Sequence, residues 1–142
     1  MRALIINGPN LNLLGLREAE HYGSLTLKEL NQTIVAKFPT VSFDFFQSNS
    51  EAQIIDLLQQ ASDYHFLLIN PGGLAHYSVS LRDAFSYVKV PKGVCHLSNI
   101  YKRETFRRVD LLSDLADVYV VGLKEDSYYQ ALEKLLSKVL KK

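Results

Sequence analysis

The sequence has little of several residue types on which particular classes of protein depend. It contains no tryptophan and one cysteine, Cys95, so it can form neither an internal disulfide bond nor a cysteine-rich zinc site. Its 7 glycines and 4 prolines are too few for a collagen-like or low-complexity chain. Its 16 basic and 15 acidic residues give a net charge of +1, which creates no field to attract a nucleic acid or a membrane. We therefore expect a packed globular protein that binds neither.

Long hydrophobic runs are also missing. The longest, such as Phe66 to Ile69, fall far short of the roughly 20 residues that span a bilayer. The segment that follows Met1 has no signal-peptide pattern. A chain of 142 residues that is 47% hydrophobic can bury one core. We therefore expect one domain, residues 1–142, located in the cytoplasm.

Short apolar runs alternate with helical periodicity along the whole chain. The runs predicted as strands are Ala3–Ile6, Val41–Phe46, Phe66–Ile69, Val94–Leu97 and Val118–Val121. Capping patterns at Thr26 and Ser50 open two predicted helices, and residues 78–88 and 127–140 predict two more. Alternation with strands buried on both faces predicts an α/β fold, a flavodoxin-like three-layer sandwich with a five-stranded parallel sheet in the order 2-1-3-4-5.

Polar residues follow four of the predicted strands, at the sheet edge where α/β proteins bind ligands. These segments are Asn7–Asn12, Gln47–Asn49, Asn70–Gly73 and His96–Asn99. Asn and Ser after a strand usually form turns or helix caps. Four such segments at one edge favour a functional site.

The connection from Gly8 to Ser24 is long for a segment without regular structure, which is typical of a binding loop or lid. It carries Arg17 and Tyr22. A guanidinium beside a phenol favours the phenolate, so this tyrosine could act as a general base. The alternative is an ordinary surface arginine with a half-buried tyrosine.

His76 and His96 fall at the same edge, and either could exchange a proton near neutral pH. The alternative is a structural, hydrogen-bonded role for each. Their spacing is not that of a compact metal site, and we predict no metal. Cys95 lies in an apolar run and is predicted to pack in the core. The chain has no glycine-rich nucleotide motif.

The motifs together resemble one family over almost the whole chain. Asn7–Gly15, Arg17-Glu18 and Tyr22-Gly23 strongly resemble the opening of type II 3-dehydroquinate dehydratases. The later matches occur in the family's order: Gln47-Ser48-Asn49 with Glu51, Ile69-Asn70-Pro71-Gly72 with His76 and Ser78, Leu81–Ala84, His96–Asn99, and Arg103-Glu104 with Phe106-Arg107. Several long, separate motifs make chance similarity improbable.

The resemblance implies dehydration of 3-dehydroquinate to 3-dehydroshikimate through an enolate, without metal or organic cofactor, in a homododecamer built as a tetramer of trimers. Removing a proton beside a ketone and expelling water requires a base, an oxyanion partner and an acid. By analogy with the family, Tyr22 is the base, activated by Arg17, and His96 is the acid. Asn10 lies near the chemistry, and Asn12 resembles the residue that helps to hold a water at the enolate.

The same analogy assigns substrate binding. Asn70 and the backbone amides of Leu97 and Ser98 would hold the carboxylate end of the substrate. His76 and Arg107 would meet ring hydroxyls. The other two assignments are Asp83, which would reach the site of a neighbouring subunit, and Arg103, which would support the site.

The chain departs from the family two positions before His96, where Val94 replaces a common glutamate that orients the imidazole. Val109-Asp110-Leu111 also replaces a His-Ser-Tyr-like segment. Loss of the acidic partner predicts a less well oriented His96 that is less often protonated. The alternative function is therefore a catalytically weakened relative that binds a small cyclic carboxylate as a sensor or scaffold.

Overall fold

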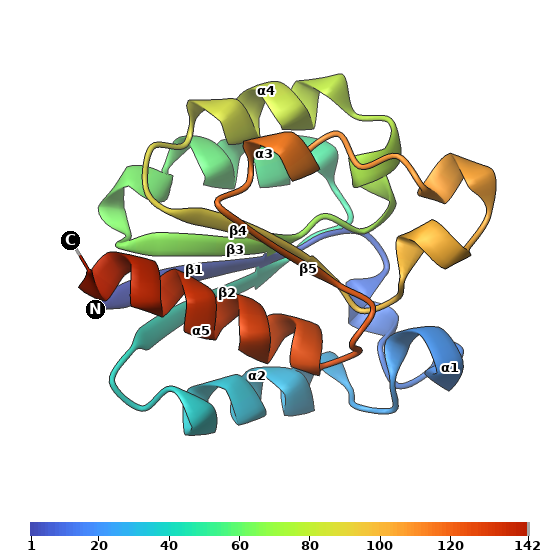
Figure 1. Ribbon diagram of the computed structural model, residues 1–142, viewed down its shortest axis with the longest axis horizontal. Coiled ribbons are helices and arrows are strands. Elements are labelled where there is room, and N and C mark those ends of the chain that lie inside the picture. The colour runs from blue at the N-terminus through green and yellow to red at the C-terminus, as the bar shows by residue number, and fades with distance from the viewer. Residues whose placement is uncertain (142) are drawn as a thin grey trace.

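The computed structural model describes residues 1–141 and has a central parallel sheet between two layers of helices (Figure 1). The strands are β1 (Arg2–Asn7), β2 (Ser42–Gln47), β3 (Phe66–Asn70), β4 (Lys92–His96) and β5 (Val118–Val121). Their order is β2-β1-β3-β4-β5, with every pair parallel. The predicted flavodoxin-like arrangement is confirmed.

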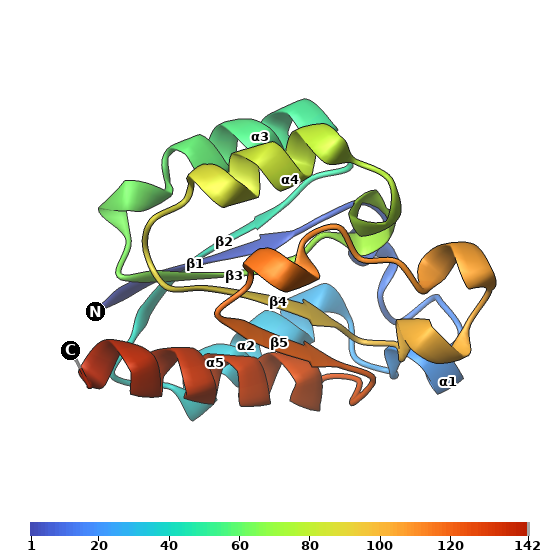
Figure 2. The ribbon, with the colours of Figure 1, turned by 45° about the horizontal axis from the view of Figure 1, so that its top comes forward.

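The longer helices divide between the two faces of the sheet (Figure 2). Helices α2 (Leu27–Lys37) and α5 (Asp126–Leu140) cover one face, and α3 (Glu51–Gln59) and α4 (Val79–Tyr87) cover the other. The predicted capping box opens α2: Thr26 Oγ1 accepts from the Glu29 amide at 3.1 Å, and Glu29 Oε1 accepts from the Thr26 amide at 3.0 Å. Two of the four backbone N–H groups that have no partner within the helix are therefore hydrogen-bonded by these side chains.

Strand residues alternate between two separate cores, which explains why the strands are almost continuously apolar. In β1, Ala3 and Ile5 pack in the core with α2 and α5, whereas Leu4 and Ile6 pack in the core with α3 and α4. In β4, Cys95 lies in the first core and Val94 in the second. His96 therefore extends from the same face of β4 as Val94.

The segment Gly8–Ser24 was expected to lack regular structure, and this expectation is wrong. It contains a 3-10 helix (Leu11–Leu13) and the one-turn helix α1 (Ala19–Tyr22). Leu11 and Leu14 are buried and hold the segment against the first core, so it forms compact local turns. The helical turns of this segment are three and four residues long, too short to give a helical period in the sequence.

All five strands end on the side of the molecule where α1 and residues 100–107 lie, and both termini lie on the opposite side (Figure 1). Ligand-binding loops of open α/β sheets occupy this carboxyl-end position. Each helix within residues 1–141 is too short or too polar to pass through a bilayer.

Candidate active site

A pocket of about 230 Å³ opens where β1, β3 and β4 end. It is lined by nine of the twelve residues assigned from the sequence: Asn10, Arg17, Tyr22, Asn70, His76, His96, Leu97, Ser98 and Arg107. These residues lie at the ends of the three strands and in the segments that follow them. Three of the four segments predicted from the strand ends therefore line the pocket, whereas Gln47–Asn49 does not.

The other three assigned residues lie outside the lining. Arg103 stands behind Tyr22 and hydrogen-bonds to it. Asn12 is exposed, and its Oδ1 accepts a hydrogen bond from Gln47 Nε2 at 3.4 Å. Asp83 is exposed on α4.

The loops that carry the pocket touch one another through backbone. A Cβ at Gly8 would lie 2.5 Å from the Pro71 carbonyl oxygen, so only glycine permits this approach between the loops after β1 and β3. Asn10 follows with a left-handed φ of 70°, a conformation that asparagine tolerates better than most residues. Its amide donates to Asn49 Oδ1 at 3.0 Å, which ties in the loop after β2. Three loops are thus joined below the pocket.

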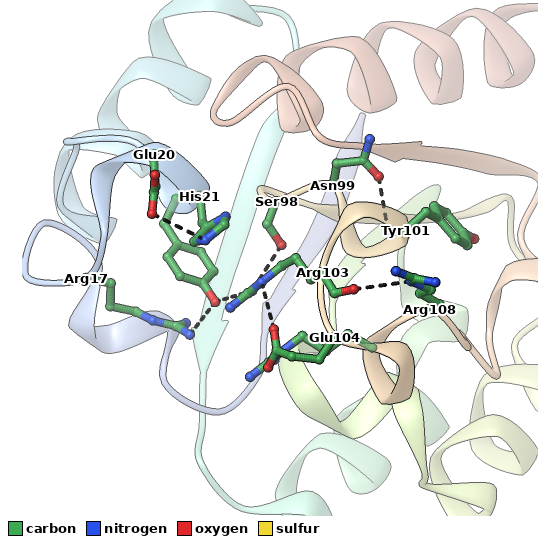
Figure 3. Close-up of polar contacts among 11 residues, drawn as sticks. Arg17, Glu20, His21, Ser98, Asn99, Tyr101, Arg103, Glu104 and Arg108 are labelled. Atoms are coloured by element: carbon green, nitrogen blue, oxygen red, sulfur yellow. Dashed lines mark hydrogen bonds and ion pairs between the residues drawn. The ribbon is translucent and has the colours of Figure 1, made fainter.

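Tyr22 ends α1 and is 8% exposed, and its phenol oxygen meets two guanidinium groups. Arg17 Nη2 donates to the oxygen at 2.6 Å and Arg103 Nη1 donates at 2.5 Å. Arg17 reaches this point from the turn before α1, and Arg103 from the segment after β4 (Figure 3). Arg17 also lies over the ring, with its Cζ 3.7 Å from the centroid. Two cations at one oxygen stabilise negative charge there, which suits a phenolate.

His96 ends β4 with 5% of its surface exposed, and it faces a buried carboxylate. Its Nε2 lies 2.8 Å from Asp110 Oδ2. The Tyr119 hydroxyl donates to the same oxygen at 2.9 Å, and the Leu112 amide donates to Oδ1 at 2.9 Å. His96 thus has an acidic partner although Val94 occupies the position where a glutamate was expected.

Two opposing effects act on Asp110. Burial raises the pKa of its carboxyl, but the hydrogen bonds from His96, Leu112 and Tyr119 and the His96 charge together hold that pKa below its usual value. Burial and the Asp110 charge raise the pKa of Tyr119, which stays a neutral phenol. An ionised carboxylate can only accept hydrogen bonds, so Nε2 of His96 is a donor.

His76 stacks near His96 with ring centroids 6.2 Å apart and an interplanar angle of 17°. Its Nδ1 lies 2.7 Å from the Val109 carbonyl oxygen, which requires an N–H there. Burial lowers the pKa of His76, and the hydrogen bond to Val109 offsets this only in part. The ring is therefore neutral near pH 7, with Nε2 as an acceptor.

A buried network supports Asn70 below the pocket. The hydroxyl of Tyr128, a fully buried residue of α5, donates to Asn7 Oδ1 at 2.5 Å and accepts from Asn70 Nδ2 at 2.9 Å. The Gly72 amide donates to Asn70 Oδ1 at 3.1 Å. These bonds fix the rotamer of Asn70 and leave one Nδ2 hydrogen for a ligand.

The sequence analysis assigned no role to Asp110, Tyr119 or Tyr128. Tyr128 and Tyr119 belong to periodic or apolar segments and read as ordinary core residues. Asp110 stands in a segment where the chain departs from the family pattern, and this departure was the one available signal. Its burial could not be read from the sequence.

A larger hollow of about 650 Å³ lies between α2 and β2. It is lined by Leu27, Lys28, Asn31, Gln32, Val35 and Phe45, and it brings together no acid–base pair. Among residues 1–141, no three His, Cys, Asp or Glu side chains gather as metal ligands. The chemistry of the described chain is therefore concentrated in the smaller pocket.

Comparison with known proteins identifies the family of the chain. The model of the family "Dehydroquinase class II" matches residues 1–136. The chain belongs to this family. A 3-dehydroquinate dehydratase from Pelodictyon phaeoclathratiforme is 43% identical over 139 residues, covering 96% of this chain and 92% of that protein. One from Idiomarina loihiensis is 46% identical over 140 residues, again covering 96% and 92%.

The fold is shared with solved members of the family. The crystal structure of a type II dehydroquinase from Butyrivibrio crossotus superposes with a TM-score of 0.92 at 35% identity and covers 96% of this chain and 97% of its own. The class II dehydroquinase fold therefore extends over almost all of the chain, including every segment that lines the pocket.

Proposed function

We propose that this protein dehydrates 3-dehydroquinate to 3-dehydroshikimate through an enolate, with Tyr22 as the base and His96 as the acid. One observation carries the proposal: a single pocket holds a phenol paired with two guanidinium groups and an imidazole paired with a carboxylate. The first pairing places positive charge beside the oxygen of the proposed base, and the second places negative charge beside the imidazole of the proposed acid. A dehydration that must both remove and supply a proton needs this combination.

The Tyr22 phenolate takes the proton from the carbon beside the ketone, and the electron pair moves to the carbonyl oxygen to give the enolate. Asn10 lies beside this chemistry, and Asn12 helps to hold a water at the enolate oxygen. The enolate then collapses to form a carbon–carbon double bond, and the C–O bond of the leaving hydroxyl breaks. His96 protonates this hydroxyl, which departs as water. One proton returned from Tyr22 to His96 completes the cycle.

Substrate binding follows from the polar groups around the pocket. Asn70 and the amides of Leu97 and Ser98 hold the carboxylate, and the spare Nδ2 hydrogen of Asn70 supports this role. His76 and Arg107 meet the ring hydroxyls. The neutral ring of His76 offers Nε2 as an acceptor for a hydroxyl hydrogen.

We further propose a cytoplasmic homododecamer, a tetramer of trimers, in which Asp83 reaches the site of a neighbouring subunit. Asp83 is exposed on α4, and exposed apolar side chains on the same helix, Val79 at 61% and Tyr87 at 64%, suit an interface. Sedimentation of the purified protein gives its subunit number, and a monomer with full activity would reject this assembly.

The test is incubation of the purified protein with 3-dehydroquinate while the ultraviolet absorbance of the conjugated enone is followed. We expect turnover by the wild type and a loss of kcat of about 10²- to 10⁴-fold in Tyr22→Phe, which keeps the ring but lacks the ionisable oxygen. Turnover by Tyr22→Phe close to wild type would reject Tyr22 as the base. A folded wild type that binds without turnover would favour the sensor or scaffold.

A further inference from the structure

We propose that Asp110 is the positioning residue for His96. Its carboxylate, from the segment that leads into β5, takes the place of the glutamate that the family commonly has at the position of Val94 on β4. The inference rests on the proposed function, because it assumes that His96 delivers the proton. It also explains how His96 keeps an acidic partner although position 94 is a valine: the partner is at position 110.

Position 94 supplies no carboxylate in this chain, because the residue there is a buried valine. Val94 is 0% exposed and pairs with Ile69 on one side and Tyr119 on the other. It lies two residues before His96 on the same face of β4, and it packs in the core with α3 and α4. Asp110 reaches His96 from outside this strand, 14 residues further along the chain.

The Asp110 side chain is held too firmly to be an accidental neighbour. It has no exposed surface, although the preceding residue, Val109, is 53% exposed. Both carboxylate oxygens are engaged, one by the Leu112 amide and the other by the Tyr119 hydroxyl and His96 Nε2. A buried charge is tolerated when hydrogen bonds satisfy it in this way. The carboxylate is therefore fixed in place before any substrate binds.

This geometry decides which nitrogen of His96 meets the substrate. The carboxylate holds the proton on Nε2, and Nδ1 has no hydrogen-bond partner among residues 1–141. When the imidazole is protonated, Nδ1–H gives its proton to the leaving hydroxyl as the C–O bond breaks, and the N–H electron pair stays on Nδ1. Nε2–H remains hydrogen-bonded to Asp110 throughout, so the aspartate is never protonated. Its role is to fix the tautomer and to stabilise the imidazolium.

The other titratable groups around this pair do not duplicate its charge. His76 stacks on His96 and is neutral, Tyr119 is a neutral donor, and Tyr101 contacts the Tyr119 hydroxyl at 3.2 Å. Arg107 lines the pocket, but its guanidinium pairs with Glu104 at 3.0 Å. Among the described residues, Asp110 is the only carboxylate within ion-pair distance of His96.

The first test is Asp110→Asn, which keeps the shape and removes the charge. We expect kcat to fall about 10- to 100-fold with KM within about twofold, as is typical when a residue that orients a catalytic group is lost. The high-pH limb of the kcat profile should move to lower pH, because imidazolium is lost earlier. The matched control is Asp114→Asn, an exposed aspartate of the same segment that pairs with Arg82. It should leave kcat and the profile unchanged.

The second test moves the carboxylate to the other position. Asp110→Ser should lose kcat as Asp110→Asn does, and Val94→Glu added to it should restore kcat and the high-pH limb. A structural role for Asp110 predicts no such rescue, since a glutamate in the core would add to the damage. Failure of the double variant to exceed Asp110→Ser, while it remains folded by circular dichroism, would overturn the inference.

Two further variants keep the outcomes distinct. Tyr119→Phe removes one hydrogen-bond donor to Asp110 and should lower kcat a few-fold without unfolding the protein. It tests the role of Asp110 if Asp110→Asn does not fold. In that case an unchanged kcat in Tyr119→Phe would reject the inference. His96→Asn tests the proposed function itself. Turnover retained in His96→Asn rejects His96 as the acid. Turnover lost in His96→Asn but unchanged in Asp110→Asn rejects the role of Asp110 alone.

Discussion

The two halves of the pocket are built in opposite ways. Tyr22 comes from a one-turn helix in a loop, and it is held by cations from two segments, since Arg103 is 81 residues away in the chain. His96 ends a central strand and is held by a buried anion, Asp110. The sign of the neighbouring charge differs between the two halves: two guanidinium groups meet the phenol oxygen, and a carboxylate meets the imidazole.

The halves also differ in what holds them. The imidazole is attached to a strand with neighbours on both sides, so the sheet itself fixes its backbone. The phenol is held by Arg17 and Arg103, which come from two separate surface segments (Figure 3). We therefore expect substitutions around Tyr22 to change mainly kcat. Substitutions at the start of β4, the strand that ends in His96, should change mainly the free energy of unfolding.

The largest effect is expected for Arg103→Met, which removes one cation from the phenol oxygen. Removing one donor from an oxygen where charge develops typically costs about 10²- to 10³-fold in kcat, so we expect a loss of about that size. Steady-state kinetics between pH 6 and 10 measure this. Lys102→Met, an exposed lysine of the same segment, is the control and should change little.

A smaller effect, on stability, is expected for Lys92→Met at the other end of β4. Lys92 Nζ donates to the carbonyl oxygens of Phe85 at 2.7 Å and Val88 at 2.9 Å, which close the end of α4. Leaving these carbonyls unpaired should lower the free energy of unfolding by about 1 to 3 kcal/mol, with kcat unchanged. Urea denaturation with Lys89→Met as the exposed control checks this. A kcat that falls with stability would show that the two ends of β4 are not independent.

The smallest effect is a difference in acid stability between the wild type and Asp110→Asn. The folded pKa of Asp110 lies below its usual value, so the charged carboxylate stabilises the fold above the unfolded pKa of about 3.9. This contribution is lost as the pH falls through the folded pKa. The gap in unfolding free energy between the two proteins should therefore narrow below about pH 4. A gap that stays constant down to pH 2 would contradict the pairing with His96.

Sequence patterns predicted the scaffold far better than the support of the acid. Strands such as Val118–Val121 were found because burial on both faces imposes an apolar run, and the helix from Leu27 was found because Thr26 and Glu29 form a recognisable cap. Asp110 has no such signal. It lies in an irregular segment, and its partner is fixed by the path of the chain across β4 and β5, which no local period encodes.

The motifs brought Arg17 and Tyr22 together correctly, because they are five residues apart and their contact is nearly local. The second cation on Tyr22 depends on how the segment after β4 folds back over α1. The resemblance named Arg103 only as a supporting residue, and the fold places it on the phenol oxygen. Long-range contacts between irregular segments are therefore where sequence reasoning stopped.

The burial of Cys95 has a practical consequence for experiments on motion. It is the sole cysteine of the chain and is 0% exposed, and burial raises the pKa of its thiol. Reagents that label thiolates should therefore not react with it. A cysteine introduced at Glu20, an exposed residue of α1, would then be the only thiol to accept a fluorophore or spin label. The native chain therefore adds no background signal to spectroscopy that tests whether α1 moves during turnover.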